Sequence, residues 1–252
     1  MGWIGKIIGG TIGLLVGGPI GAVAGAALGH GIDVHRDHSG RGGVLPGTAS
    51  PHQQAQLTFF VGAFSMLAKL AKADGTVHRE ELQEVERFIN YDLHLDPNSA
   101  RIAREIFDTA LMSQDRFEDF ADQFYRQFKN QPQILELMID VLYRVSAADG
   151  RLSPEEERLI RNAAEIFNMN STYTETIKNR YVYTDENAYA VLGCTSSDSN
   201  EVIKQAYKKL VFEYHPDTVA AKGLPEEFTE FANTKFREIQ EAYEKIRKER
   251  NF

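Results

Sequence analysis

Residues 200–217 read NEVIKQAYKKLVFEYHPD and predict a helix that stops at His215-Pro216-Asp217. Upstream of the stop, apolar side chains recur on one helical face, and lysines occupy the opposite face and its flank. Proline lacks an amide hydrogen and disfavours helical backbone in the preceding residue, so Pro216 is expected to end the helix. His215 and Asp217 are therefore expected on an exposed loop. The apolar face comprises Ile203, Ala206, Tyr207, Leu210 and Tyr214.

A second apolar stripe follows this stop and predicts an antiparallel partner helix. Together the two helices form a hairpin with His215-Pro216-Asp217 at its tip, a pattern also found in ordinary helical hairpins with a proline stop. A catalytic pair of His215 and Asp217 is disfavoured, because no nucleophile or metal-ligand spacing accompanies it. The stripe consists of Phe228, Phe231, Phe236, Ile239, Ala242, Tyr243 and Ile246.

Three segments, in order, resemble the J-domain of DnaJ-like co-chaperones. Residues 187–193 resemble its short first helix, residues 206–210 its basic second helix, and residues 236–243 its third helix. We assign residues 181–252 to this domain. The resemblance implies docking on a DnaK-type chaperone and stimulation of its ATP hydrolysis.

The resemblance also implies roles for individual residues. Asp217 is expected to pair with a basic group near the partner's ATPase machinery, with His215 and Pro216 fixing its presentation. The lysines are expected to meet an acidic chaperone surface, an interaction that salt weakens. Tyr207, at the edge of the apolar face, is expected both to pack and to dock. The lysines concerned are Lys204, Lys208 and Lys209.

The N-terminal segment contains no charged residue between Lys6 and Asp33. At about 1.5 Å per helical residue, this run exceeds the roughly 30 Å hydrocarbon core of a bilayer. It predicts a single transmembrane helix within an anchor at residues 1–36. A secretory signal peptide is the main alternative, but the run is long for one and lacks a clear cleavage site. Pro19 would kink the span or support a membrane hairpin whose halves are too short to cross.

Glycines recur every four residues along this segment and share one helical stripe. Small residues at this spacing let transmembrane helices pack closely, so we expect a homodimer through Gly13, Gly17, Gly21 and Gly25. The alternative is a lone span that glycine keeps flexible. The complete stripe consists of Gly5, Gly9, Gly13, Gly17, Gly21, Gly25 and Gly29.

The charges flanking the anchor give a weak orientation signal. Lys6 precedes the apolar run, whereas Arg36 and Arg41 follow it, and this excess favours a cytoplasmic C-terminus. A DnaK-type partner needs ATP and is cytosolic in bacteria, which agrees. We therefore expect a single-pass protein of the bacterial inner membrane with cytoplasmic C-terminal domains. Residues 37–53, rich in Gly, Ser, Pro, His and Thr, are expected to form a flexible linker.

Residues 54–180 contain an internal repeat and are expected to form one helical domain. The sequence Ala-Asp-Gly at 73–75 recurs at 148–150, and each copy is followed by a Glu-Glu pair. Each glycine permits a left-handed turn between two helices. In the second copy, Ser153, Pro154 and Glu156 predict a capping box.

The end of each copy also matches half of a calcium-binding loop, but the positions that need carboxylates in the other half are occupied by other residue types. An EF-hand is therefore excluded. The repeat instead resembles the TerB-like domain, an all-helical module of the tellurite-resistance family, in which acidic residues at these turns have been considered metal-binding. Helix capping explains the same residues without metal, and we assign none. The acidic positions are Asp74, Glu81, Asp149 and Glu156.

Composition favours a binding protein that needs no cofactor over an enzyme. The net charge of -8 argues against a nucleic-acid-binding surface, with the basic helix as a local exception. Cys194 is the single cysteine, so no internal disulfide can form, which suits a reducing compartment. Neither a glycine-rich nucleotide loop nor a zinc-binding cysteine pattern nor a nucleophile elbow occurs.

The order of the three parts is itself similar to that of membrane-anchored DnaJ-like co-chaperones. We expect an all-α chain with a transmembrane helix, a TerB-like bundle and a J-domain hairpin. The resemblance implies recruitment of a DnaK-type chaperone to clients near the bilayer and a part in envelope or capsule signalling. The alternative is a membrane-anchored metal- or stress-sensing scaffold whose J-domain is a weak accessory.

Overall fold

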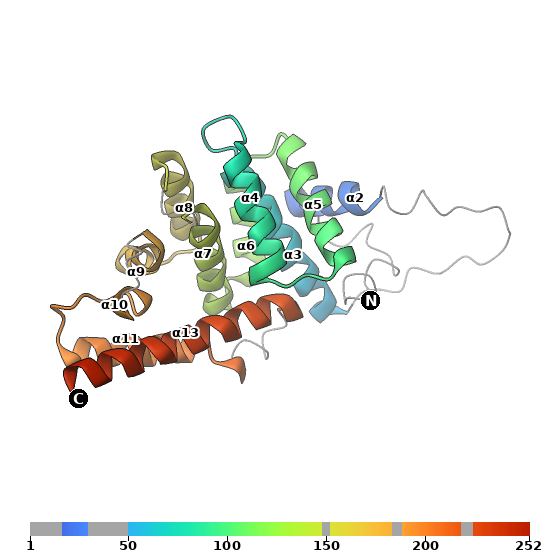
Figure 1. The fold of residues 1–252 in the computed structure, drawn as a ribbon. Coiled ribbons are helices and arrows are strands. Elements are labelled where there is room, and N and C mark those ends of the chain that lie inside the picture. The colour runs from blue at the N-terminus through green and yellow to red at the C-terminus, as the bar shows by residue number, and fades with distance from the viewer. Residues whose placement is uncertain (1–16, 30–49, 148–151, 183–187, 218–223) are drawn as a thin grey trace, which may run out of the picture.

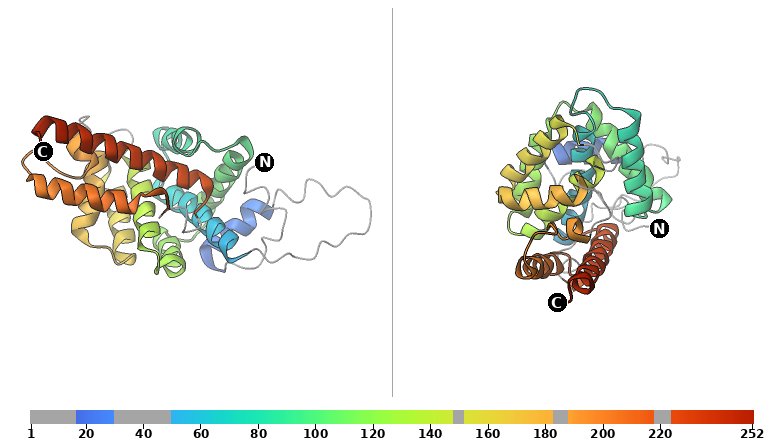
Figure 2. Two further views of the ribbon diagram at one scale, coloured as in Figure 1. Left: turned by 90° about the horizontal axis from the view of Figure 1, so that it is seen from below. Right: turned by 60° about the vertical axis from the view of Figure 1, so that its left-hand side comes forward.

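The computed structural model describes residues 17–29, 50–147, 152–182, 188–217 and 224–252. Within these ranges all regular structure is helical, as the sequence predicted. Figures 1 and 2 show a helical bundle with two long antiparallel helices lying side by side along one side of it. The longer of the two, α13, starts beside the bundle and ends well away from it (Figure 1).

The described helices begin and end at the following residues, in chain order: α2 (Gly18–Gly29), α3 (Pro51–Leu70), α4 (Arg79–Arg87), the π-helical turn η2 (Phe88–Asp92), α5 (Pro97–Met112), α6 (Phe117–Phe128), α7 (Pro132–Ser146), α8 (Pro154–Ile166), α9 (Ser171–Val182), α10 (Ala188–Val191), α11 (Asn200–Glu213) and α13 (Glu226–Arg250).

Local sequence signals set several of these helix starts. Ser50, Asp96 and Ser153 each cap a helix whose first residue is proline, and each side chain accepts a backbone N–H of the first turn. The capping box predicted at Ser153 and Glu156 is present. Helix α3 starts at Pro51, within the segment 37–53 that we expected to be a linker.

Helix α3 lies at the centre of the bundle. From Leu57 to Ala68 every side chain is buried, including Thr58 and Ser65, and a helix that is buried all round must be covered on every side. Helices α5, α6 and α7 pack against it. The ring centroid of Phe59 lies 5.6 Å from that of Phe124 and 6.2 Å from that of Phe128, so α6 is joined to α3 by aromatic contacts.

The C-terminal hairpin consists of α11 and α13, with the short α10 against α13. Tyr207 stacks on Tyr243 with ring centroids 3.9 Å apart. At the far end, Arg250 Nε donates to the Tyr189 hydroxyl at 2.8 Å, and its Nη1 donates to the Asp198 carbonyl at 2.7 Å. These contacts tie α10 and the connection that follows it to the end of α13.

The hairpin and the bundle share one apolar core at the start of α13. Phe228 is fully buried, and its ring centroid lies 4.7 Å from that of Phe59 and 6.2 Å from those of Phe60 and Phe88. Phe231 continues the contact, 5.7 Å from Phe88. We had assigned both residues only to the hairpin's own stripe, so the sequence did not reveal this junction.

Helix α2 is the described part of the N-terminal anchor, and it packs across α3, α5 and α6. The Gln123 side chain accepts the Ile20 N–H at 2.9 Å and donates to the Gly17 carbonyl. Of the described helices, none is both long and apolar enough to cross a membrane. Gly13 and the other anchor residues before 17 lie outside the described residues. The buried face of α2 comprises Ile20, Val23, Ala24, Ala27 and Leu28.

One of the stripe glycines lies on the outer side of α2, and another lies just before the helix. Gly25 on α2 and Gly17 before it are exposed, and a Cβ added to either would meet no atom within 4 Å. Gly21 is half-buried. Gly25 therefore leaves an open surface on the helix, and Gly17 leaves one at its start, where Gly18 has a φ of +77°.

Replacing Phe228 with alanine should destabilise the whole chain by about 3–5 kcal/mol, because the cavity would open where the hairpin joins the bundle. The measurement is urea unfolding followed by circular dichroism. Phe212→Ala is the control, because Phe212 is 63% exposed on α11, and its loss should cost no more than about 0.5 kcal/mol. Similar losses for the two variants would contradict the shared core.

Candidate functional site

Helix α11 presents the basic residues that the sequence singled out. Ser199 caps the helix by accepting the Val202 N–H at 3.3 Å. Lys208 and Lys209 are exposed, and Lys209 Nζ lies 3.8 Å from a Glu213 carboxylate oxygen, which is one turn away. The outer face of α11 is therefore positively charged near its C-terminal half.

The other two predicted docking residues are partly covered by α13 and the chain end. Lys204 is half-buried, with Nζ 4.9 Å from the ring centroid of Phe252. Tyr207 is half-buried and stacked on Tyr243. Much of the Tyr207 side chain is therefore covered by packing, whereas Lys208 and Lys209 on the same helix are exposed to solvent.

The end of α11 displays the acidic residue of the tripeptide. The His215 ring packs edge-on against Phe236 at 5.6 Å, and its Nδ1 accepts the backbone N–H of Asp217 at 3.2 Å. The Asp217 side chain is 94% exposed. Pro216 and Asp217 adopt helical backbone, so the loop conformation that we expected for Asp217 is wrong. The exposure that we expected is present, because Pro216 still interrupts α11.

A buried ion pair in the bundle contacts the residue that precedes the turn at residues 215–217. Asp140 on α7 is fully buried, and its Oδ1 lies 3.3 Å from Nη1 of Arg180 on α9, whose side chain is 8% exposed. The same Nη1 donates to the hydroxyl of Tyr214 at 3.3 Å. Burial raises the pKa of Tyr214 well above its ordinary value, so its hydroxyl stays protonated. The residue before His215 is thus fixed to the bundle.

This buried cluster was not predicted, although the sequence carries one signal of it. Asp140 interrupts the apolar run of α7, and a carboxylate at a core position needs a cationic partner. Nothing in the sequence identified Arg180 as that partner.

The backbone at Gly193 also lies close to α9. Its φ is +65°, and a Cβ there would come within 2.2 Å of Thr176. The J-domain-like region therefore has several fixed points on the bundle.

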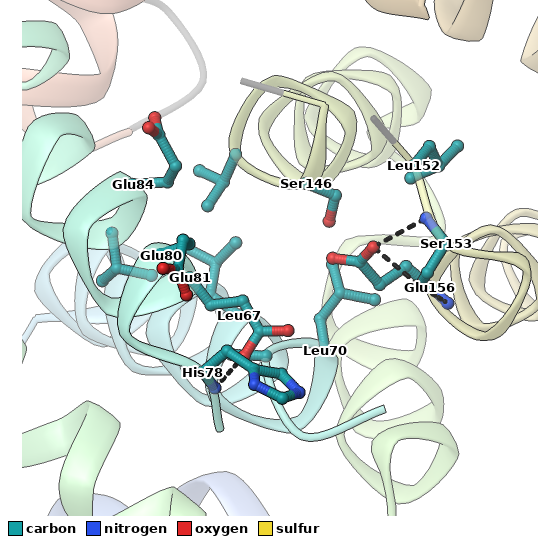
Figure 3. Close-up of a pocket in the computed structure, with 13 residues that line it drawn as sticks. Leu67, Leu70, His78, Glu80, Glu81, Glu84, Ser146, Leu152, Ser153 and Glu156 are labelled. Atoms are coloured by element: carbon teal, nitrogen blue, oxygen red, sulfur yellow. Dashed lines mark hydrogen bonds between the residues drawn. The ribbon is translucent and has the colours of Figure 1, made fainter. Parts of the chain in front are cut away.

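A second candidate site is a cavity of about 390 Å³ in the helical bundle (Figure 3). Its walls come from the end of α3, the start of α4, the end of α7 and the start of α8. The floor is apolar and the rim is acidic. The apolar residues are Leu67, Leu70, Ala71, Val85, Val145 and Leu152, and the polar ones are His78, Glu80, Glu81, Glu84, Ser146, Ser153 and Glu156.

Two of the glutamates in this cavity cap helices. Glu81 Oε2 accepts the His78 N–H at 2.7 Å, and Glu156 Oε2 accepts the Ser153 N–H at 3.0 Å and its hydroxyl at 2.8 Å. The capping interpretation is therefore confirmed for these two positions. Burial raises the pKa of Glu81, and repulsion from Glu156 acts in the same direction.

Asp74 belongs to the turn beside the cavity. Its Oδ1 accepts the Thr76 N–H at 2.9 Å, and its Oδ2 lies 2.9 Å from His78 Nε2. These contacts lower the pKa of Asp74, the backbone N–H most, and raise that of His78. Asp149 lies outside the described residues, and in the described parts of the chain no three His, Cys, Asp or Glu side chains are placed to hold a metal ion.

Family comparisons agree with this arrangement. The model for the co-chaperone DjlA transmembrane domain matches residues 1–48, that for tellurite resistance protein TerB residues 61–179, and that for the DnaJ domain residues 187–251. Co-chaperone protein DjlA of Vibrio cholerae is 32% identical, with 98% of each chain covered. The chain belongs to the DjlA co-chaperone family. It is therefore a membrane co-chaperone with an N-terminal transmembrane domain, a TerB domain and a DnaJ domain.

Other DjlA relatives are also similar over nearly their whole length. The protein of Photobacterium profundum is 30% identical, over 98% of this chain and 99% of its own. That of Coxiella burnetii is 30% identical, over 100% of this chain and 99% of its own. No solved structure matches. The DjlA order of domains thus extends along the entire chain.

Replacing Glu81 with glutamine should stabilise the fold at pH 7. A raised pKa means that the folded state binds the Glu81 proton more tightly than the unfolded state, so deprotonation costs stability as pH rises. Glutamine keeps an acceptor for the His78 N–H without the charge. Melting temperatures should differ most at pH 7, and the difference should shrink toward the unfolded pKa of about 4.3.

Glu80→Gln is the matched control, since it removes one negative charge from the same helical turn. The gain in melting temperature should be larger for Glu81→Gln. If the melting temperature of Glu81→Gln at pH 7 is equal to or below that of the natural chain, the charged form of Glu81 does not destabilise the fold.

Proposed function

We propose that the chain binds a DnaK-type chaperone through α11 and the turn at residues 215–217, and stimulates its ATP hydrolysis. The observation that carries this proposal is the display of Asp217, which is 94% exposed at the end of a lysine-bearing helix. The supporting turn is held by the packing of His215 on Phe236 and by the buried contact between Arg180 and Tyr214. A fixed, solvent-facing carboxylate is able to meet a cationic group on a partner without a large ordering cost.

The lysines provide the attraction that precedes this contact. Lys208 and Lys209 are exposed on α11, in a chain whose net charge is -8, so the positive potential is local. Complementary charge on the chaperone would speed encounter and fix the orientation of docking. Lys204 and Tyr207, which α13 and Phe252 partly cover, would contribute at the edge of the same surface. In this proposal the His215-Pro216-Asp217 turn stimulates ATP hydrolysis, and the lysines attract and orient the chaperone.

The proposal places the chain in the bacterial inner membrane, with the TerB and DnaJ domains in the cytoplasm. The transmembrane-domain match at residues 1–48 supports the anchor, and the excess of Arg36 and Arg41 over Lys6 supports the orientation. We assign the anchor to residues 1–36, the linker to 37–53, the TerB domain to 54–180 and the DnaJ domain to 181–252. ATP and the partner would then lie on the same side of the membrane as Asp217.

We further propose that two chains associate through the glycine stripe. The open surface at Gly25 on α2, and at Gly17 just before the helix, supports this, since a partner helix could approach there at backbone distance. Gly13, outside the described residues, and the half-buried Gly21 belong to the same stripe. Dimerisation would hold two DnaJ domains close together and raise avidity for a shared client or chaperone.

Asp217→Asn should reduce stimulated ATP hydrolysis to the chaperone's own basal rate, because the neutral amide loses the charge that pairs with the partner. The assay is single-turnover hydrolysis by a DnaK-type chaperone, with the full chain in phosphatidylcholine nanodiscs. His215→Gln should act in the same way through the lost contact with Phe236. Undiminished stimulation by Asp217→Asn would remove the proposal.

Replacing Lys208 and Lys209 together with glutamate should instead raise the concentration needed for half-maximal stimulation several-fold, with a smaller effect on the maximal rate. The defect should shrink as salt is added, because screening weakens the natural attraction. Arg126→Glu combined with Lys129→Glu, two exposed reversals at the end of α6, is the control with the same change in net charge. Equal defects in the two variants would argue against a docking role for α11.

Gly17→Leu combined with Gly25→Leu should abolish dimers that are trapped by crosslinking of the full chain in lipid vesicles. Leucine would block close helix approach, yet the open space at both positions leaves the packing of α2 intact. Ala22→Leu is the control, because Ala22 is exposed on α2 and lies off the stripe. Unchanged dimers in the glycine variant would refute association through this stripe.

A further inference from the structure

We infer that the cavity lined by α3, α4, α7 and α8 binds a basic, partly apolar peptide segment of another protein. The cavity volume of about 390 Å³ falls in the range of ligand sites, and an apolar side chain fits such a space. Its floor is built from aliphatic side chains at the ends of α3 and α7, including Leu67, Leu70 and Val145. These three side chains are buried, with exposed fractions of 1%, 2% and 9%, so the cavity is walled by packed aliphatic groups, which favour an apolar occupant.

The rim of the cavity supplies the charge that selects a cation. Four glutamates line it: Glu80 and Glu81 from the first turn of α4, Glu84 from its second turn, and Glu156 from the first turn of α8. Figure 3 shows Glu81 and Glu156 on opposite sides of the cavity. Their capping hydrogen bonds use Oε2, and among the described residues no hydrogen bond to Oε1 of either carboxylate is present, which leaves that oxygen to a ligand. A lysine or arginine between them would contact both, while its neighbours in the peptide fill the apolar floor.

Rigid elements hold these carboxylates in place before any ligand arrives. Glu81 and Glu156 lie in the first turns of two helices and are fixed by the backbone N–H groups of His78 and Ser153. A preorganised site loses little entropy when it binds. The mutual repulsion that disfavours the charged form of Glu81 would be relieved by a bound cation. Glu84 already pairs with Arg87 at 3.1 Å, so the inner pair is the stronger attractor.

A divalent metal fits these observations less well than a basic peptide. Metal ions of this class need several oxygen ligands around one point, and in the described part of the chain no group of three such ligands is assembled. The aliphatic floor provides no ligand atom. A peptide with lysine or arginine beside leucine or valine uses both the rim and the floor.

Segments of this chemistry occur where membrane proteins leave the bilayer on the cytoplasmic side, which carries an excess of Lys and Arg. The inference therefore rests on the proposed placement of the TerB domain beside the cytoplasmic membrane surface. We commit to such a juxtamembrane segment as the occupant. The cavity would hold a membrane-protein client while α11 engages the chaperone, and the two surfaces come from different helices.

The test is fluorescence anisotropy with the full chain in phosphatidylcholine nanodiscs and a labelled peptide of repeating Leu-Lys-Leu-Leu-Lys, against empty nanodiscs. Glu81→Gln with Glu156→Gln removes two charges but keeps acceptors for both caps, so the helices remain formed. This double variant should bind at least about tenfold more weakly. Asp119→Asn, which alters the same capping role at Arg116 on α6, should bind like the natural chain.

Two altered peptides separate the cavity from general attraction. A peptide with glutamate in place of lysine should not bind, and one with serine in place of leucine should bind much more weakly. Equal affinity of the natural chain and the double variant would overturn the inference. Full binding of the serine peptide would also overturn it. So would calorimetric heat of binding for calcium, magnesium or zinc, if the same metal ion displaces the peptide.

The outcome is separable from that of the chaperone assay. Asp217→Asn should bind the peptide normally, and the double glutamine variant should stimulate ATP hydrolysis normally. Failure of the natural chain to bind the peptide, with its stimulation of ATP hydrolysis intact, would overturn only the inference. Intact, glutamate-dependent peptide binding without chaperone stimulation would support the cavity and overturn only the proposed function.

Discussion

The burial of Phe228 among the phenylalanines of the bundle is the contact on which the remaining arrangement depends. It places the first turn of α13 in the same core as Phe59 and Phe88, so the hairpin does not hang from a free linker. Because α11 packs along α13, the direction of α11 is set by the bundle as well. The turn at residues 215–217 is therefore positioned by the aromatic cluster in the bundle.

The buried pair of Asp140 and Arg180 reinforces this junction in a different way. A charged pair in an apolar interior contributes little net stability, but removing one partner leaves an uncompensated charge and costs about 3–5 kcal/mol. Arg180 also reaches the Tyr214 hydroxyl, immediately before His215. The pair therefore favours one orientation of the turn over others. A change within the TerB domain could in this way alter how Asp217 is displayed.

The sequence predicted the local structure well because its signals are local. Apolar spacing identified α11 and α13, and Ser153 with Glu156 identified the start of α8. The tripeptide and the lysines were found for the same reason. Long-range contacts were missed, since Phe228 satisfies the hairpin pattern whether or not it also enters the bundle. The covering of Lys204 by Phe252 likewise depends on where the chain end lies.

The anchor shows why composition alone does not fix packing. The same aliphatic side chains that suit a bilayer, such as Ile20 and Val23, are buried against the bundle in the described part of α2. Any environment that removes an apolar run from water lowers its free energy, whether that environment is a bilayer or a protein core. The family match assigns the segment to a transmembrane domain, which the run from Lys6 to Asp33 had indicated.

Hydrogen exchange of the full chain, with and without a DnaK-type chaperone and ATP, tests whether a hairpin held in the bundle core docks on the chaperone. New protection is expected at residues 204–217 when the chaperone is present. Slow exchange is expected at residues 228–232 in both states, because that turn belongs to the bundle core. Unchanged exchange at 204–217, or exchange at 228–232 as fast as at an independent hairpin, would contradict docking by a hairpin that the bundle core holds.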